Sequence, residues 1–165
     1  RILEKKLLCC CLQFGYFNKK AFASLDAFVE RLDAFFGDWP DDLPLAVEIR
    51  NKNWMTQPFA DCLRSHEAAW VLSDQSWMPS PLFVVQKLDA VTGPFGYVRL
   101  LGDRAEVDRL TKTLDHVVVD RQDQLHADAE AIRLLAKRVP VLAFINNHFA
   151  GYAPETLRQL QAALD

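Results

Sequence analysis

The sequence predicts an α/β fold with a parallel sheet, because strand-length apolar segments alternate with segments of helical periodicity. Half of the 165 residues are hydrophobic, so the chain can bury one sizeable core, and we predict a single domain over residues 1–165. The net charge of −3 indicates no surface for binding a polyanion. The five predicted strands are Leu7–Phe14, Pro44–Arg50, Ala68–Ser73, Phe95–Leu101 and Val139–Asn146.

The segments between these strands have the patterns of helices and loops. Lys19–Phe36 places apolar residues at helical spacing with charged residues between them, and Gly37 and Pro40 then indicate a turn. Arg121–Arg138 is the clearest helix after this first one. The remaining predictions are short helices at Pro58–His66, Ala105–Thr113 and Pro154–Leu164, one or two helical turns in Pro79–Leu88, loops at Asn51–Thr56 and Asn147–Ala153, and a brief extended piece at His116–Asp120.

The four cysteines indicate a reducing compartment rather than a metal or redox site. Cys9, Cys10 and Cys11 are consecutive and Cys62 is alone, so no CxxC spacing is present. We interpret them as small buried side chains and predict a cytoplasmic protein. The apolar runs are far shorter than the roughly 18–20 residues of a membrane helix, so we predict no membrane span.

Two architectures fit five alternating β/α units. A complete five-stranded, doubly wound sheet of the flavodoxin type is one, and composition alone favours it. The later part of a (β/α)8 barrel, which takes about 250 residues in full, is the other.

The order of several short motifs favours the barrel. LQF ends the first strand, VEIRNKNW covers the second and the residues after it, Asp74 ends the third, YVRLLG forms the fourth, and FINN precedes GYAP before the last helix. This combination resembles the YecE-like family of TIM-barrel-like proteins, also called domain of unknown function 72. The resemblance implies that the chain corresponds to strands four to eight of such a barrel and is N-terminally incomplete. The family's first three strands, with their Gly- and Trp-rich opening motif, have no counterpart in the sequence.

The sequence departs from the family pattern at two places. The family commonly has prolines after the Gln, where this chain has Phe14–Gly15–Tyr16, and it usually has His where Leu101 stands. The family has no assigned reaction, so the resemblance implies a fold and leaves enzymatic activity uncertain.

Charged residues inside the apolar strands indicate where a functional site lies. Glu48 and Arg50 share one face of their strand, and such charges are costly unless they are paired or face a site. Active sites of these barrels lie at the carboxyl ends of the strands. A buried network that merely closes the barrel is the alternative explanation. The polar residues at or near such ends are Gln13, Glu48, Arg50, Asp74, Arg99, Asn146 and Asn147.

These residue types predict a pocket for a small anionic or phosphorylated ligand, which includes sugar-like ligands. We expect Arg50 and Arg99 to hold the negative charge, because a guanidinium binds a carboxylate or phosphate through two hydrogen bonds. Glu48 is the first candidate for a general base and Asp74 the second catalytic candidate. Gln13 is a further candidate for ligand binding, and Asn146 and Asn147 are expected to orient the ligand or the loop rather than react.

Two further features follow predicted strands and are candidates for ligand binding. Trp54, and also Trp77, follow their strands and would stack a sugar or base, or else pack as a cap over the barrel. Gly151 and the helix that starts near Pro154 are candidates for a phosphate site, although Pro154 removes one N–H donor.

Cofactors and partners are less defined by the sequence. His148 with Glu48 and Asp74 would make a three-ligand metal site, but no HxH or HExxH spacing is present. We therefore assign no metal ligand. We expect no cofactor, and a divalent metal is the one alternative that the residue types leave open. A nucleic-acid-processing barrel enzyme and a non-catalytic binding or scaffold protein are the alternative functions. We expect a small-molecule ligand and no nucleic acid, and the oligomeric state is open.

Overall fold

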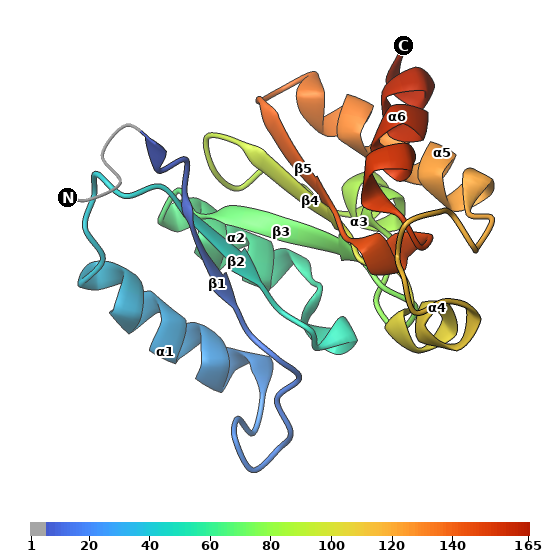
Figure 1. Cartoon of the computed structure of the whole chain (residues 1–165). Helices are drawn as coiled ribbons and strands as arrows, with labels where there is room; N and C mark the ends of the chain where they lie inside the picture. The colour runs from blue at the N-terminus through green and yellow to red at the C-terminus, as the bar shows by residue number, and fades with distance from the viewer. Residues whose placement is uncertain (1–5) are drawn as a thin grey trace.

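Five parallel strands form one sheet in the computed structural model, which describes residues 6–165 (Figure 1). Four of the five strands are shorter than the apolar runs that predicted them, because the ends of those runs continue into loops, whereas the third strand keeps its predicted six residues and is shifted by one. Along the sheet the strands follow one another in chain order. Their bounds are β1 Cys10–Gln13, β2 Leu45–Glu48, β3 Ala69–Asp74, β4 Gly96–Leu100 and β5 Val141–Ile145.

The helices lie between successive strands, as the alternating pattern predicted. The first begins at Leu25, later than the predicted Lys19, because Ser24 caps it and its side chain accepts a hydrogen bond from the Ala27 backbone N–H at 3.2 Å. Two helices, α4 and α5, separate β4 from β5. The bounds are α1 Leu25–Gly37, α2 Gln57–Ser65, α3 Pro81–Lys87, α4 Arg104–Leu110, α5 Gln122–Ala136 and α6 Ala153–Leu164, with short 3-10 turns η2 Lys52–Trp54 and η3 Asn147–Phe149.

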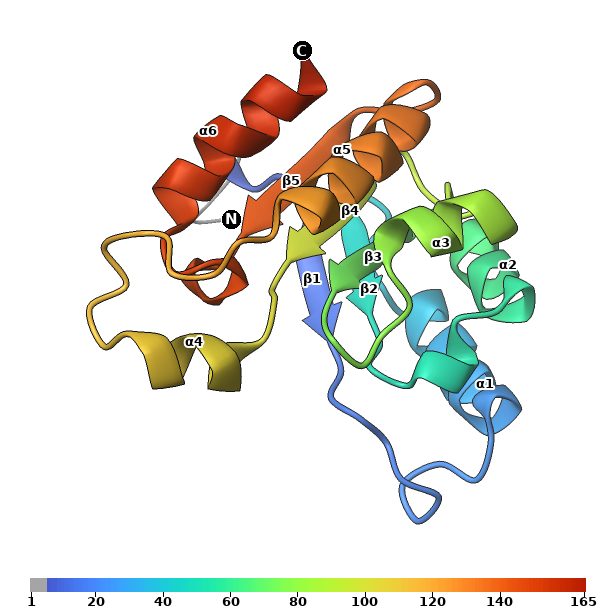
Figure 2. The ribbon, with the colours of Figure 1, turned by 90° about the vertical axis from the view of Figure 1, so that its right-hand side faces the viewer.

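The sequential strand order excludes the doubly wound alternative, in which the strand order reverses and helices cover both faces. Figure 2 shows α1, α2 and α3 along β2 and β3, and α5 beside β4 and β5. The main core lies between these helices and one face of the sheet, and it includes Val47, Trp70 and Val98. A smaller cluster on the other face draws its buried members from β2, β3 and β4. The architecture is compatible with a TIM-barrel-like parallel fold, as predicted.

The segment His116–Asp120, predicted as a brief extended piece, contains no strand and lies in the loop between α4 and α5. The backbone N–H groups of Val118 and Val119 donate to the carbonyl of Ala150 at 2.8 and 3.2 Å. These bonds hold the loop against the residues that precede α6. Among the helices of residues 6–165, none has the length and apolar character needed to cross a membrane.

Candidate functional site

Four side chains from β1, β2 and β4 form one hydrogen-bonded cluster. Arg99 Nη1 donates to Gln13 Oε1 at 2.6 Å and also to Glu48 Oε2. Arg50 Nε donates to the other oxygen, Glu48 Oε1, at 3.0 Å. The structure therefore brings together four of the residues that the sequence placed at strand ends.

Strand register explains how these distant residues meet. Gln13 is paired with Glu48 across β1 and β2, so their side chains lie on the same face. Arg99 on β4 is paired with Ser73 on β3. Because the Ser73 side chain is small, the long Arg99 side chain extends across β3 and reaches β2 and β1.

The cluster contains one buried carboxylate and two partly exposed guanidinium groups. The Glu48 side chain is 0% exposed, whereas those of Arg50 and Arg99 are 26% and 21% exposed. A buried carboxylate is tolerated when cations and hydrogen bonds compensate its lost hydration. Two guanidinium groups share this single carboxylate, so the cluster carries one surplus positive charge that is accessible to solvent through the two arginines.

The two arginines face a cleft of about 620 Å³ at the carboxyl ends of the strands. Glu48 lies beneath this cleft and does not line it. The cleft is lined by Gln13, Arg50, Gln75, Trp77, Arg99, Leu101, Gly102, Asp103, Arg104, Ala105, Asp108, Asn146, Asn147 and His148.

Asn146 and Asn147, which follow β5, line the opposite wall from Gln13. Asn146 Oδ1 accepts a hydrogen bond from the backbone N–H of His148 at 2.9 Å, and Asn147 Oδ1 accepts one from the Ala153 N–H at 2.9 Å. These bonds fix which end of each amide is the oxygen, so the two Nδ2 groups remain as donors. His148 adds its ring to this wall and contacts Asp108 through Nε2 at 3.2 Å.

Asp74, the second catalytic candidate, lies on the helix side of the sheet and outside the cleft. Its Oδ2 accepts a hydrogen bond from Gln124 Nε2 on α5 at 2.5 Å, and its carboxyl is hydrogen-bonded to that of Asp128 on the same helix. Burial raises the pKa of Asp74, and the bond from Gln124 counteracts part of this rise. Burial and the adjacent Asp74 together raise the pKa of Asp128 to about 9.

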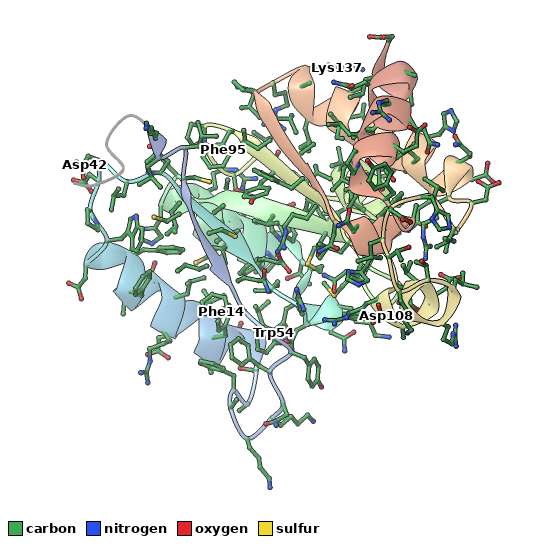
Figure 3. The ribbon with its side chains drawn as sticks, in the orientation of Figure 1. Phe14, Asp42, Trp54, Phe95, Asp108 and Lys137 are labelled. Carbon is green, nitrogen blue, oxygen red and sulfur yellow. The ribbon has the colours of Figure 1, made fainter. Side chains whose placement is uncertain are left out.

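Trp54 is also outside the cleft, in an aromatic cluster beside α1 (Figure 3). Its ring stacks on Phe28 with centroids 5.2 Å apart and on Phe17 at 6.0 Å. The sequence left two roles open for Trp54, stacking on a ligand and packing, and these contacts are those of packing.

Gly151 faces the loop between α4 and α5 rather than the cleft. Its φ is +112°, and a Cβ placed there would lie 2.6 Å from the His116 carbonyl oxygen. The first N–H of α6, that of Ala153, already donates to Asn147. The Ala153 N–H and the space beside Gly151 are therefore used by contacts within the chain.

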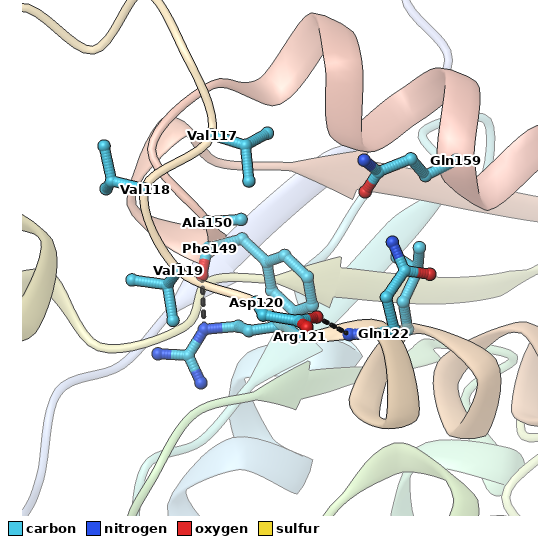
Figure 4. A pocket seen from close by; sticks show the side chains of 10 residues that line it. Val117, Val118, Val119, Asp120, Arg121, Gln122, Phe149, Ala150 and Gln159 are labelled. Atoms are coloured by element: carbon cyan, nitrogen blue, oxygen red, sulfur yellow. Dashed lines mark hydrogen bonds between the residues drawn. The ribbon is translucent and has the colours of Figure 1, made fainter.

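A second cavity, of about 360 Å³, lies under this loop and contains Arg121 (Figure 4). Arg121 Nε donates to the Phe149 carbonyl at 2.5 Å, and its two remaining nitrogens bind Gln124 and Glu106. Because all three nitrogens of this guanidinium have partners, the cavity offers no cation comparable to Arg50 or Arg99.

Several cleft residues were not predicted from sequence. Asp103 caps α4, and Arg104 and Asp108 lie on this helix, which follows β4 after the tight turn at Gly102. Their position could have been predicted from the sequence, since this helix follows a strand whose carboxyl end was already assigned to the site. Within residues 6–165, no three His, Cys, Asp or Glu side chains are grouped closely enough to hold a metal ion. Asp74 in particular is separated from Glu48 and His148 by the sheet.

Comparison with known proteins agrees with this architecture. A DUF72 family protein of Thermotoga maritima superposes with a TM-score of 0.68 at 24% identity, covering 99% of this chain and 60% of that one. A DUF72 family protein of Enterococcus faecalis gives a TM-score of 0.65 at 23% identity, covering 99% and 63%. The chain thus spans less than two thirds of the length of these solved structures. Among curated proteins, none matches the chain.

The family assignment comes from the sequence as a whole. The family model described as "Protein of unknown function DUF72" matches residues 1–165. This match confirms the resemblance that the strand-end motifs indicated, and the chain belongs to the DUF72 family.

Proposed function

We propose that the cleft binds a small anionic or phosphorylated molecule whose negative charge is held by Arg50 and Arg99. The observation that carries this proposal is the sharing of one buried carboxylate, Glu48, by two partly exposed guanidinium groups. An anion in the cleft would balance the surplus charge, and a guanidinium has the planar geometry to bind phosphate or carboxylate oxygens in pairs. The Nδ2 groups of Asn146 and Asn147 add neutral donors for the same ligand.

The size of the cleft supports a small-molecule ligand. Its volume of about 620 Å³ lies within the range of roughly 300–1,000 Å³ that small-molecule sites occupy. Gly102, with φ of +66°, turns the chain so that its backbone approaches His148 and Phe149 closely, which holds the wall that carries Asn146.

Glu48 has two roles to distinguish within this proposal. A general base must reach the proton that it removes, directly or through a water. Glu48 is fully buried, and each of its oxygens already accepts a hydrogen bond from an arginine. These contacts favour Glu48 as the anchor that positions both guanidinium groups, and the base role stays a prediction.

Thermal unfolding with and without inorganic phosphate tests anion binding. Phosphate at ten times its dissociation constant stabilises a folded protein by about 1.4 kcal/mol, which corresponds to roughly 3–6 °C in Tm for a chain of this size. We expect Arg50→Ala to remove this shift. Arg158→Ala is the matched control, since Arg158 is an exposed arginine on α6 that pairs with Glu155 away from the cleft. Equal shifts in both variants, or no shift in the parent chain, would contradict the proposal.

Glu48→Gln tests the anchoring role of Glu48. If Glu48 anchors the arginines, its neutral replacement leaves two uncompensated cations, and phosphate should bind more tightly. Unchanged phosphate affinity in the variant would contradict the anchoring role. Isothermal titration calorimetry of both chains at one ionic strength distinguishes these results.

A further inference from the structure

Trp77 differs from the other three tryptophans in its surroundings. Trp54 and Trp70 pack against phenylalanine rings, and Trp39 packs against Phe35 and donates its Nε1–H to a backbone carbonyl. Trp77 is 54% exposed and lines the cleft. Within residues 6–165, its indole has neither a ring contact nor a hydrogen bond.

The exposure of Trp77 does not come from a loosely held loop. Before it, Gln75 is buried and its Nε2 donates to Ser73 Oγ at 2.9 Å. After it, Met78 is buried and its backbone N–H donates to the Gln75 carbonyl at 3.0 Å. The residues on either side therefore fix the backbone of Trp77, and a large flat ring is held at the cleft with about half of its surface exposed to solvent.

We propose that Trp77 is the stacking surface for a ring of the ligand, so that the cleft selects a phosphate ester of a cyclic group over an acyclic one. This inference rests on the proposed anion site, which supplies the charged half of the ligand contact through Arg50 and Arg99. An indole at a polar cleft stacks on the apolar face of a sugar or on a nucleobase. A phosphate group alone is far smaller than a cleft of about 620 Å³, which leaves room for the attached ring.

Binding of four defined probes tests this selectivity: inorganic phosphate, glycerol 3-phosphate, ribose 5-phosphate and adenosine 5′-monophosphate. A stacked ring typically strengthens binding roughly 5- to 150-fold. We expect ribose 5-phosphate, adenosine 5′-monophosphate or both, which contain rings, to bind more tightly than glycerol 3-phosphate by a factor in this range. Which of the two gains affinity shows whether the sugar or the base stacks on Trp77.

Substitution of Trp77 assigns the preference to this residue. Trp77→Ala should lower the affinity for the ring-containing ester to that for glycerol 3-phosphate, whose own affinity should not change. Trp77→Phe should retain most of the difference in affinity. Phe83→Ala is the control, because Phe83 is an aromatic residue on α3, 53% exposed, outside the cleft. The Trp77 variants should unfold close to the parent temperature, since the side chain is 54% exposed and, within residues 6–165, has no ring contact or hydrogen bond to lose.

The outcomes separate this inference from the proposed function. If all phosphate esters bind with equal affinity, or if the preference survives Trp77→Ala, the stacking inference is overturned and the anion site stands. If inorganic phosphate and all three esters fail to bind, the proposed function fails and the inference fails with it.

Discussion

The buried carboxyl pair of Asp74 and Asp128 makes the stability of the chain depend on pH. Asp128 is 1% exposed, its pKa is raised from 3.8 to about 9 by burial and by Asp74, and within the described residues its Oδ2 has no hydrogen-bond partner. The folded chain therefore keeps a proton on Asp128 that the unfolded chain releases. Because the unfolded state binds fewer protons between pH 3.8 and about 9, the free energy of unfolding should fall as pH rises through this range.

The size of this effect follows from proton linkage. One full proton corresponds to about 1.4 kcal/mol per pH unit. Asp74 and Asp128 share this proton and titrate as a pair, so the dependence is spread over a wider pH range than for an isolated group. We expect the parent chain to lose roughly 2 kcal/mol between pH 6 and pH 8 through this pair.

Asp128→Asn removes the proton while keeping the shape of the side chain and a donor to Asp74. Urea unfolding of both chains at pH 6, 7 and 8 measures the difference, and the variant should become the more stable chain as pH rises. Asp123→Asn is the control, since Asp123 is exposed on the same helix. Parallel pH profiles for the parent and Asp128→Asn would refute the reasoning, because they would show that Asp128 holds no extra proton in the folded state.

Three further substitutions test the assignment of residues to site or core, each by urea unfolding. Arg99→Ala leaves the buried Glu48 with one cation and should cost roughly 3 kcal/mol, and adding Glu48→Gln should recover part of it; no recovery would contradict the pairing. Trp54→Ala should cost roughly 3 kcal/mol and leave phosphate affinity unchanged, whereas a loss of affinity would place Trp54 in the site. Gly151→Ala should cost roughly 2 kcal/mol, because φ is +112° and its Cβ would meet the His116 carbonyl; an unchanged stability would refute this.

The sequence predicted the parts of the site that depend on local pattern. Glu48 and Arg50 interrupt an apolar strand, and the alternation of side chains placed them on one face, where they form a hydrogen bond. The motif order also identified the family and the parallel β/α architecture. The prediction that Gln13 and Arg99 lie near Glu48 followed because carboxyl ends of parallel strands share one edge.

The sequence did not determine the side of the sheet on which Asp74 lies. The strand Ala69–Asp74 is buried along its whole length, so its sequence lacks the apolar–polar alternation that would reveal its faces. Ser73 faces the cleft cluster and Asp74 faces α5, and a shift of one residue would have exchanged them.

Loop paths likewise depended on the tertiary structure. Trp54 and Trp77 both follow strands, but η2 turns the first into the core beside α1, while the turn at Gln75–Met78 holds the second at the cleft. By itself the sequence determined the fold class, the family and the strand-end charges, because these depend on periodicity and residue order. Only the tertiary structure decided which polar and aromatic side chains share the cleft, because that depends on strand register and on contacts between residues far apart in the chain.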